Sequence, residues 1–321
     1  MTPDEAAPGP PIVAVVGATA TGKSALGVAL AERLPGGGEI VNADALQAYR
    51  GFDLGTAKPD AATRLRVRHH LIDVLDPHER WSAGEFARQA RLAIADIRGR
   101  GSWPIVVGGS GLYLRALLAG ISPVPPADPR VRERLRRRAA EEGLGPLVAE
   151  LARLDPATAA RLAPGDRQRV LRALEVAWVS GRPLSAWIAE QPFGIQSIAA
   201  IRVGLTLPRS ILYDRIAGRV ARMVESGWME EVRGLLGRGL DPDLPAFQAI
   251  GYRQLAHHVR GEWPLARAVE ETVRATRRFA KRQETWFRKE PDVTWFSAED
   301  LDRRIPHVLE HVARGFGEGR G

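Results

Sequence analysis

The sequence contains no cysteine among its 321 residues. A disulfide scaffold, a thiol nucleophile and a thiolate metal site are therefore excluded. No apolar run approaches the roughly 18 residues that a membrane-spanning helix requires. The chain begins MTPDEAAPGPP, where a secretory signal would carry basic residues and then an apolar segment. We therefore expect a cytoplasmic protein that does not associate with membranes.

Lysine is also scarce, although the chain is strongly basic. Lysine and arginine together number 46 against 38 acidic residues, which gives a formal net charge of +8. Every basic residue is arginine except Lys23, Lys58, Lys281 and Lys289. The positive balance favours a polyanionic partner or an anionic substrate. Where lysine is retained despite this bias, we expect its compact charge to matter.

Short apolar runs alternate with helical patterns over the first third of the chain. The runs are rich in β-branched residues, as is typical of buried parallel strands. We predict strands at residues 12–16, 39–41, 70–74 and 104–107, and helices at 25–34, 84–97 and 112–118. This alternation predicts an α/β fold with a largely parallel sheet flanked by helices.

A proline-rich segment at residues 121–129, ISPVPPADP, interrupts this alternation and is typical of a stiff linker. Only helical patterns follow it, until a strand at 199–207. We therefore predict a small all-helical insertion at residues 128–195, within a core formed by residues 1–127 and 196–321. The remaining core elements are predicted as helices at 209–226, 229–237 and 265–288, a strand at 293–296 and a closing helix.

The most specific motif follows the first predicted strand. It has the form GxxxxGKS and precedes a predicted helix, which is the context of the phosphate loop in P-loop NTPase-like folds. Backbone N–H groups and the helix N-terminus would bind a diphosphate, the lysine would neutralise it, and the serine would hold Mg²⁺. The residues are Gly17, Ala18, Thr19, Ala20, Thr21, Gly22, Lys23 and Ser24.

Two more polar residues follow predicted strand ends. ATPases and kinases of this class usually carry a metal-binding aspartate after a later strand, but here that strand ends in Gly-Gly-Ser-Gly. Ser110 in this turn could donate to a phosphate or bridging oxygen, or could only cap the next helix. Asp44, after the second strand, could be a metal-linked acid, a general base or a helix cap.

The positive charge is concentrated in two segments. Residues 274–289 contain seven basic residues and one acid, with Trp286 and Phe287 among them, and residues 130–138 contain six arginines and one glutamate. Charge runs are usually solvated helix faces. Two such runs, one with aromatic side chains, also fit a groove for a nucleic-acid backbone.

Eight motifs in order resemble those of one enzyme family. They are GATATGKS, NADALQAY, DLGTAKP, HHLID, VGGSGLY, DRQRVLRALE, QAIGYR and AKRQETWFR. Over about residues 12–296 the chain is similar to the tRNA dimethylallyltransferases, also called tRNA isopentenyltransferases. The resemblance implies transfer of a dimethylallyl group from dimethylallyl diphosphate to N6 of adenosine 37 in the tRNA anticodon stem-loop, with Mg²⁺, by a monomeric enzyme.

The resemblance also implies roles for individual residues. The phosphate loop would hold the donor diphosphate, with Lys23 neutralising it, Asp44 would act as general base, and Ser110 would steady the oxygen of the breaking bond. The family usually has threonine at the position of Ser110 and often proline at that of Ala18. The implied tRNA contacts are Asp44, Ala45, Leu46, Gln47, Ser110, Arg132, Gln168, Arg169, Val170, Leu171, Arg172, Gln248, Ala249, Ile250, Gly251, Tyr252, Arg253, Lys281, Arg282, Gln283, Glu284, Thr285, Trp286, Phe287 and Arg288.

Other classes of function explain only part of these features. A small-molecule P-loop kinase or an RNA-dependent ATPase would account for the loop, but not for the absent acidic strand end. An RNA-binding module without catalysis would account for the charge, but not for a complete phosphate loop near Asp44. Prenylation of free AMP would leave the insertion at 128–195 without a purpose.

Overall fold

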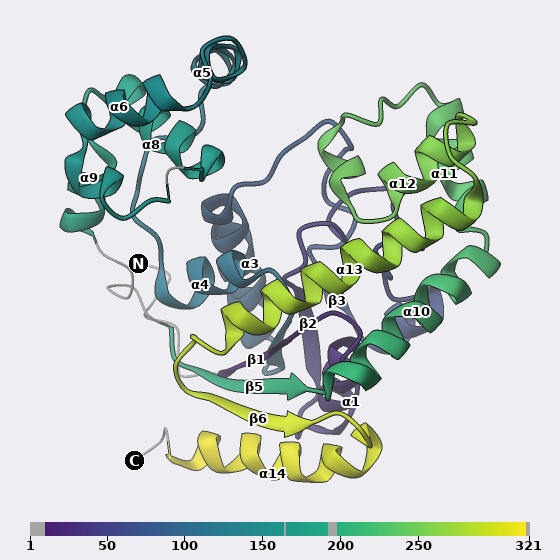
Figure 1. The fold of residues 1–321 in the computed structure, drawn as a ribbon. Helices are drawn as coiled ribbons and strands as arrows, with labels where there is room; N and C mark the ends of the chain where they lie inside the picture. Colours follow the sequence, from purple (N-terminus) through teal and green to yellow (C-terminus); the bar gives the residue numbers. More distant parts are fainter. Residues whose placement is uncertain (1–9, 164, 192–197, 319–321) are drawn as a thin grey trace. The chain divides into compact units, whose positions relative to one another are not determined.

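The computed structural model describes residues 10–163, 165–191 and 198–318 (Figure 1). Their strands are β1 (Ile12–Gly17), β2 (Gly38–Asn42), β3 (His69–His70), β4 (Trp103–Val107), β5 (Ala200–Thr206) and β6 (Val293–Ser297). They form one sheet in the order β3-β2-β4-β1-β5-β6, and every pairing is parallel. The predicted α/β fold with a parallel sheet flanked by helices is confirmed.

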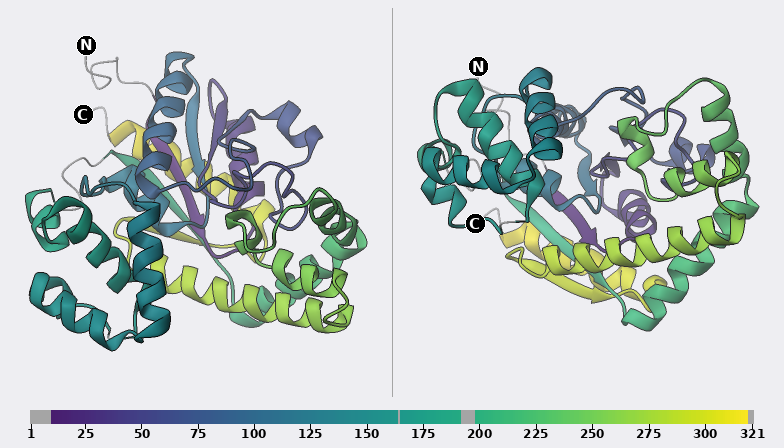
Figure 2. Two further views of the ribbon diagram at one scale, coloured as in Figure 1. Left: turned by 90° about the horizontal axis from the view of Figure 1, so that it is seen from above. Right: turned by 45° about the horizontal axis from the view of Figure 1, so that its top comes forward.

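The central strands are buried on both faces. All residues of β1 and β4 are buried, because helices cover both sides of the sheet (Figures 1 and 2). The register pairs Val13 with Ile105 and Val15 with Val107. These side chains belong to the largest apolar cluster described, together with Leu26 of the helix after β1. The continuous apolar runs in the sequence follow from this double burial.

The compact unit that holds the sheet comprises Met1–Leu118 and Ile198–Gly321. Its described helices before the insertion are α1 (Lys23–Arg33), α2 (Ala61–Arg66), α3 (Ala83–Gly99) and α4 (Gly111–Ala119). After the insertion come α10 (Arg209–Glu225), α11 (Trp228–Gly237), the 3-10 helix η1 (Pro245–Gln248), α12 (Tyr252–Val259), α13 (Leu265–Phe287) and α14 (Leu301–Glu318). Helices α10 and α13 pack side by side (Figure 2).

The prediction of a strand at residues 70–74 was wrong beyond its first residue. Strand β3 ends at His70, and Leu71 and Asp73 then adopt positive φ values of 63° and 57°. The Asp73 carboxylate accepts hydrogen bonds from Lys58 and Arg64. These ion pairs stabilise a turn where the apolar pattern predicted an extended chain. Helices α2 and α12 were not predicted; α2 buries no side chain and therefore carries no hydrophobic periodicity.

The second compact unit, Ala119–Ser197, is helical in its described part. Its helices are α5 (Pro129–Glu141), α6 (Gly145–Leu154), α7 (Pro156–Ala159), α8 (Arg167–Ser180) and α9 (Leu184–Glu190). Leu135, Leu147, Leu151 and Leu174 form its apolar core. The sequence prediction placed the boundaries of the insertion at residues 128 and 195, and residue 195 lies outside the described part of the chain.

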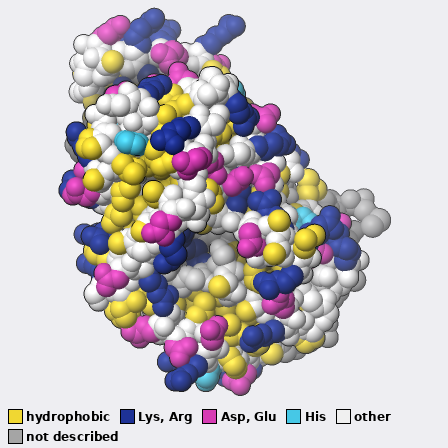
Figure 3. All heavy atoms as spheres, turned by 90° about the vertical axis from the view of Figure 1, so that its right-hand side faces the viewer, with side chains coloured by type: hydrophobic (Ala, Val, Ile, Leu, Met, Phe, Trp, Pro, Cys, Tyr) yellow, Lys and Arg dark blue, Asp and Glu magenta, His cyan; other side chains and the backbone are white. Residues whose placement is uncertain are grey.

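The surface carries charges of both signs. On the face at the right of Figure 1, where α10, α11 and α12 lie, lysine and arginine side chains alternate with acidic ones (Figure 3). On that face the net positive charge does not form a continuous patch. Among the described helices, none is both long and apolar enough to cross a bilayer.

Candidate active site

Three loops leave neighbouring strands at the same edge of the sheet. Strands β2, β4 and β1 are adjacent and parallel, so their carboxyl ends lie together. The phosphate loop follows β1, Asp44 follows β2, and Ser110 follows β4. Direct contacts join two of these loops, because Ser110 N–H donates to Ala43 O (3.3 Å) and Ala45 N–H donates to Ser110 Oγ (3.3 Å).

The phosphate loop has a conformation that suits an anion. Gly22 stands immediately before α1 in a left-handed conformation (φ 93°) and provides no side-chain cap. Helix α1 begins at Lys23, so its first N–H groups have no acceptor within the helix. Thr21 turns inward, where its hydroxyl donates to Ala18 O (2.9 Å). The loop therefore presents a helix N-terminus with unsatisfied donors, which is a binding site for phosphate.

Lys23 lies inside this loop. Its Nζ donates to Ala18 O at 2.6 Å and forms no ion pair with a carboxylate of the described residues. Burial lowers the pKa of its ammonium group to about 8, an effect that Asp44 opposes and Arg219 reinforces. A lysine desolvated in this way gains most from an anion that enters the loop.

Arg219 is a functional candidate that the sequence did not reveal. It comes from α10, and its Nη1 donates to Thr19 Oγ1 in the phosphate loop at 3.2 Å. Burial lowers the pKa of its guanidinium, Asp44 partly offsets this, and no carboxylate in the described chain forms an ion pair with it. Lys23 and Arg219 are thus two desolvated cations next to one carboxylate.

Asp44 is held in a tight polar turn. Its N–H donates to Asn42 Oδ1 (3.0 Å), and its Oδ1 accepts from Leu46 N–H (3.0 Å). Asn42 Nδ2 donates to the carbonyls of Asp44 and Leu71, both at 3.0 Å. Among the described residues none donates a hydrogen bond to the other oxygen of this carboxylate, and the negative charge of Asp44 acts on both Lys23 and Arg219. This placement suits a proton acceptor beside an anion site.

Ser110 does not use its hydroxyl to cap α4. The Oγ atom instead accepts from Ala45, so it links the β4 loop to the β2 loop. The donation of this hydroxyl to a phosphate or bridging oxygen therefore stays a prediction. The hydroxyl hydrogen stays available to donate to such an oxygen.

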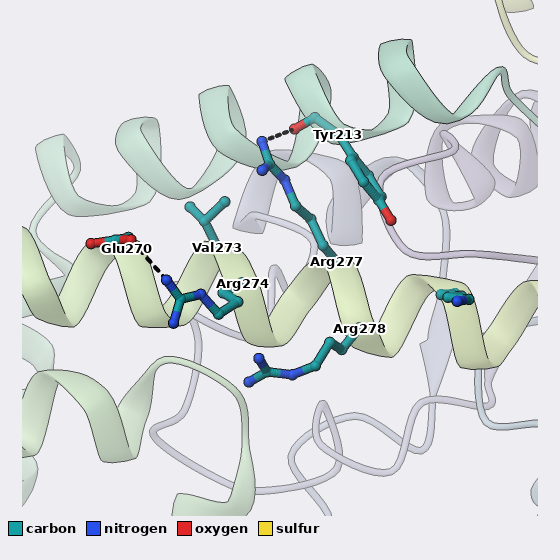
Figure 4. A pocket seen from close by; sticks show the side chains of 7 residues that line it. Tyr213, Glu270, Val273, Arg274, Arg277 and Arg278 are labelled. Atoms are coloured by element: carbon teal, nitrogen blue, oxygen red, sulfur yellow. Dashed lines mark hydrogen bonds and ion pairs between the residues drawn. The ribbon is translucent and has the colours of Figure 1, made fainter.

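Helix α13 carries the basic run and borders a pocket. The pocket has a volume of about 350 Å³ and lies between α10 and α13 (Figure 4). Arg277 reaches across to Tyr213, over whose ring its guanidinium lies at 4.9 Å, and Arg274 pairs with Glu270. The lining residues are Tyr213, Glu270, Val273, Arg274, Arg277, Arg278 and Lys281. Arg278 and Lys281 are exposed and form no ion pair with any described residue.

Several of the implied tRNA contacts are buried in apolar clusters. The side chains of Val170, Ala249, Tyr252 and Phe287 are at most 2% exposed. Gln283 is also buried, and both ends of its amide are bonded within the protein. By contrast, the structure exposes Gln168, Arg169, Gln248, Arg253, Lys281, Arg282, Thr285 and Arg288.

In the helical unit, two of the implied arginine contacts share a buried acid. Glu175 is 1% exposed and accepts from Arg132 Nη2 (2.9 Å) and Arg172 Nη1 (2.8 Å). Arg172 also donates to Pro125 O at 2.6 Å. The two guanidinium groups are therefore held in fixed positions, while each keeps further N–H donors.

Fold and site together define a P-loop protein of the α/β class in which two cations, Lys23 of the loop and Arg219 of α10, lie near a single carboxylate, Asp44. The family model for IPP transferase matches residues 47–290, and the chain belongs to this family of tRNA dimethylallyltransferases. The tRNA dimethylallyltransferase of Syntrophobacter fumaroxidans is 49% identical over 302 residues, which cover 94% of this chain and 88% of that protein. That of Sorangium cellulosum is 47% identical over 300 residues, covering 90% and 95%.

Solved structures agree with this assignment. The full-length tRNA isopentenylpyrophosphate transferase of Bacillus halodurans superimposes with a TM-score of 0.70 at 38% identity, covering 96% of this chain and 97% of that one. A eukaryotic dimethylallyltransferase acting on tRNA gives a TM-score of 0.78 at 26% identity, covering 92% and 75%. The P-loop NTPase-like fold is thereby confirmed.

Proposed function

We propose that the protein transfers a dimethylallyl group from dimethylallyl diphosphate to the N6 amine of adenosine 37 in tRNA. The observation that carries the proposal is the pair of desolvated cations, Lys23 and Arg219, at a phosphate loop with Asp44 as the nearby carboxylate. Family membership supplies the substrate pair.

The donor diphosphate is the leaving group of this reaction. The allylic carbon tolerates positive charge, and negative charge accumulates on the departing diphosphate oxygen. Loop N–H groups, Lys23 and Arg219 stabilise that charge in a desolvated site, where each interaction is stronger than in water. Ser110 donates its hydroxyl hydrogen to the bridging oxygen.

The acceptor amine needs a base. An exocyclic adenine amine is a weak nucleophile because its lone pair is delocalised into the ring. Asp44 accepts a proton from this amine as the C–N bond forms. The C–O bond to the diphosphate breaks in the same reaction, so no covalent enzyme intermediate is required.

The proposal includes Mg²⁺ on the diphosphate. Ser24, at the start of α1, is exposed and offers one hydroxyl ligand. The described residues contain no cluster of three His, Cys, Asp or Glu side chains able to hold a metal. That donor set fits Mg²⁺ bound chiefly by phosphate oxygens and water, with one protein oxygen. When bound, the ion would neutralise part of the diphosphate charge.

We propose that the phosphates of tRNA bind to basic side chains on α13 and on the helical insertion. At the α13 pocket, Arg278 (Figure 4) and Lys281 are exposed and form no ion pair with any described residue, as phosphate contacts require. Arg132, Arg169 and Arg172 of the insertion would contact the anticodon stem. The target base must leave its stack to meet the donor, which costs a few kcal/mol that base contacts offset. We further propose a monomer in the cytoplasm.

The test compares two phosphorylated substrates, dimethylallyl diphosphate and ATP. The protein is incubated with an unmodified anticodon stem-loop, Mg²⁺ and dimethylallyl diphosphate, and released pyrophosphate is measured. We expect release only when donor and RNA are both present. In a parallel reaction ATP replaces the donor, and we expect no RNA-stimulated phosphate release. Robust hydrolysis of ATP with no release from the prenyl donor would establish an RNA-dependent ATPase or kinase instead.

A further inference from the structure

Gln283 on α13 joins two loops of the candidate active site. The N–H of Thr19 in the phosphate loop donates to its Oε1 at 2.8 Å. Its Nε2 donates to Gly109 O at 2.9 Å, one residue before Ser110. The side chain is 5% exposed. A single amide thus bridges segments that lie 264 and 174 residues away in the sequence.

The approach of α13 to these loops depends on glycine. A Cβ atom at Gly109 would overlap Gln283 Nε2, and one at Gly111 would overlap the indole nitrogen of Trp286. Gln283 and Trp286 are three residues apart and so lie on the same face of α13. Trp286 is held in turn by the Arg115 guanidinium, 4.6 Å from its ring centroid. Helix α13 is therefore closely packed against the turn that carries Ser110.

The opposite face of the same helix is basic. With 3.6 residues per turn, Arg274, Arg278 and Lys281 project away from the side that buries Gln283. One helix thus connects the proposed RNA-binding surface to the loop that would hold the donor. A side chain at position 283 that both donates and accepts is needed to satisfy Thr19 N–H and Gly109 C=O together.

We infer that Gln283 is a positioning residue that fixes the phosphate loop and the Gly109–Ser110 turn in the conformation that binds the donor diphosphate. The inference rests on the proposed function for the identity of the donor. By engaging Thr19 N–H, Gln283 orients that peptide inward and leaves the donors at the start of α1 for the phosphates. By engaging Gly109 O, it sets the position of the neighbouring Ser110.

Three variants test this role. Gln283→Ala removes both hydrogen bonds. Gln283→Glu is nearly isosteric: its protonated carboxyl can donate to Gly109 O and accept from Thr19, whereas the ionised form has no donor and repels the carbonyl. Gln254→Glu is the matched control, because Gln254 Oε1 only accepts from Gly251 N–H at 2.8 Å and a carboxylate preserves that bond.

The primary measurement is the Kd of inorganic pyrophosphate without RNA, by calorimetry, from pH 5.5 to 8.5. For Gln283→Ala we expect a Kd raised about tenfold at every pH, as expected for a lost buried hydrogen bond. For Gln283→Glu we expect a Kd close to that of wild type at pH 5.5. At pH 8.5 its Kd should be at least about tenfold higher than that of wild type at the same pH. The control should follow wild type throughout.

Kinetics separates positioning from a general loss of structure. At basic pH the KM for dimethylallyl diphosphate should rise in both Gln283 variants while the tRNA Kd stays near wild type, and at acidic pH the thermal unfolding midpoint of Gln283→Glu should stay near wild type. A pyrophosphate Kd within twofold of wild type in Gln283→Ala, or a pH-independent ratio for Gln283→Glu, overturns the inference. A wild-type protein that binds pyrophosphate but transfers no prenyl group refutes the proposed function alone.

Discussion

The titration of Lys23 predicts how donor binding depends on pH. Burial lowers the pKa of its ammonium group to about 8 in the free site. A bound diphosphate places negative charge beside this ammonium group and raises its pKa. Binding above pH 8 therefore requires uptake of a proton. Affinity is therefore fully present below about pH 8 and is lost as the pH rises through that value.

The size of the change in Kd follows from the fraction of Lys23 that is protonated at each pH. A group with a pKa of about 8 is about nine-tenths protonated at pH 7 and about one-tenth at pH 9. The Kd of dimethylallyl diphosphate should therefore rise about tenfold between these two values. Arg219 retains its charge over this range, so binding weakens without being abolished.

Calorimetric titration of a non-reactive dimethylallyl diphosphate analogue tests this prediction. Titrations in buffers with different ionisation enthalpies report the protons taken up, which should approach one per ligand at pH 9. Lys23→Arg is the control, because its charge does not titrate in this range and its Kd should not change with pH. A wild-type Kd that is the same at pH 7 and pH 9, with no proton uptake, would refute the reasoning.

Three further predictions concern the candidate active site and the basic residues of α13. Asp44→Asn should lower the single-turnover rate at saturating substrates by at least ~10² and leave tRNA affinity within a few fold, because only the proton acceptor is lost; a variant that keeps more than a tenth of the wild-type rate would exclude Asp44 as the base. Arg219→Gln should weaken pyrophosphate binding by at least about tenfold through loss of a desolvated cation, measured by calorimetry; an unchanged Kd would make Arg219 a structural residue. Joint replacement of Arg278 and Arg282 by alanine should lower the slope of log K for tRNA against log salt by about one to two units, since each phosphate contact contributes roughly 0.7 to 0.9; an unchanged slope would make them part of a solvated face.

The sequence predicted those features that depend on local pattern. Continuous apolar runs predicted β1 and β4 because both strand faces are buried. The GKS motif predicted the phosphate loop because its lysine and glycine spacing is fixed by the turn into α1. Asp44 and Ser110 were predicted as site residues because they follow parallel strands, whose carboxyl ends lie at one edge of the sheet.

Features that depend on distant contacts could not be predicted. Arg219 lies in an ordinary amphipathic helix, and its function as a site residue arises only from the contact with Thr19, 200 residues earlier. Gln283 stands in a run that suggested either a solvated face or an RNA groove, yet its side chain is buried against two loops. Tyr252, within an implied tRNA motif, is instead buried and donates to Glu231. Burial of a polar residue is decided by the partner element, which the local sequence does not contain.

The central claim concerns where the prenyl group is placed, and nucleoside mass spectrometry tests it most directly. An unmodified anticodon stem-loop is treated with the protein, Mg²⁺ and dimethylallyl diphosphate, then digested, and the position and atom of modification are determined. We predict N6-dimethylallyladenosine at position 37 and at no other adenosine. RNA recovered unmodified, or alkylated at an atom other than N6, would contradict the assignment of Asp44, Lys23 and Arg219 to this reaction.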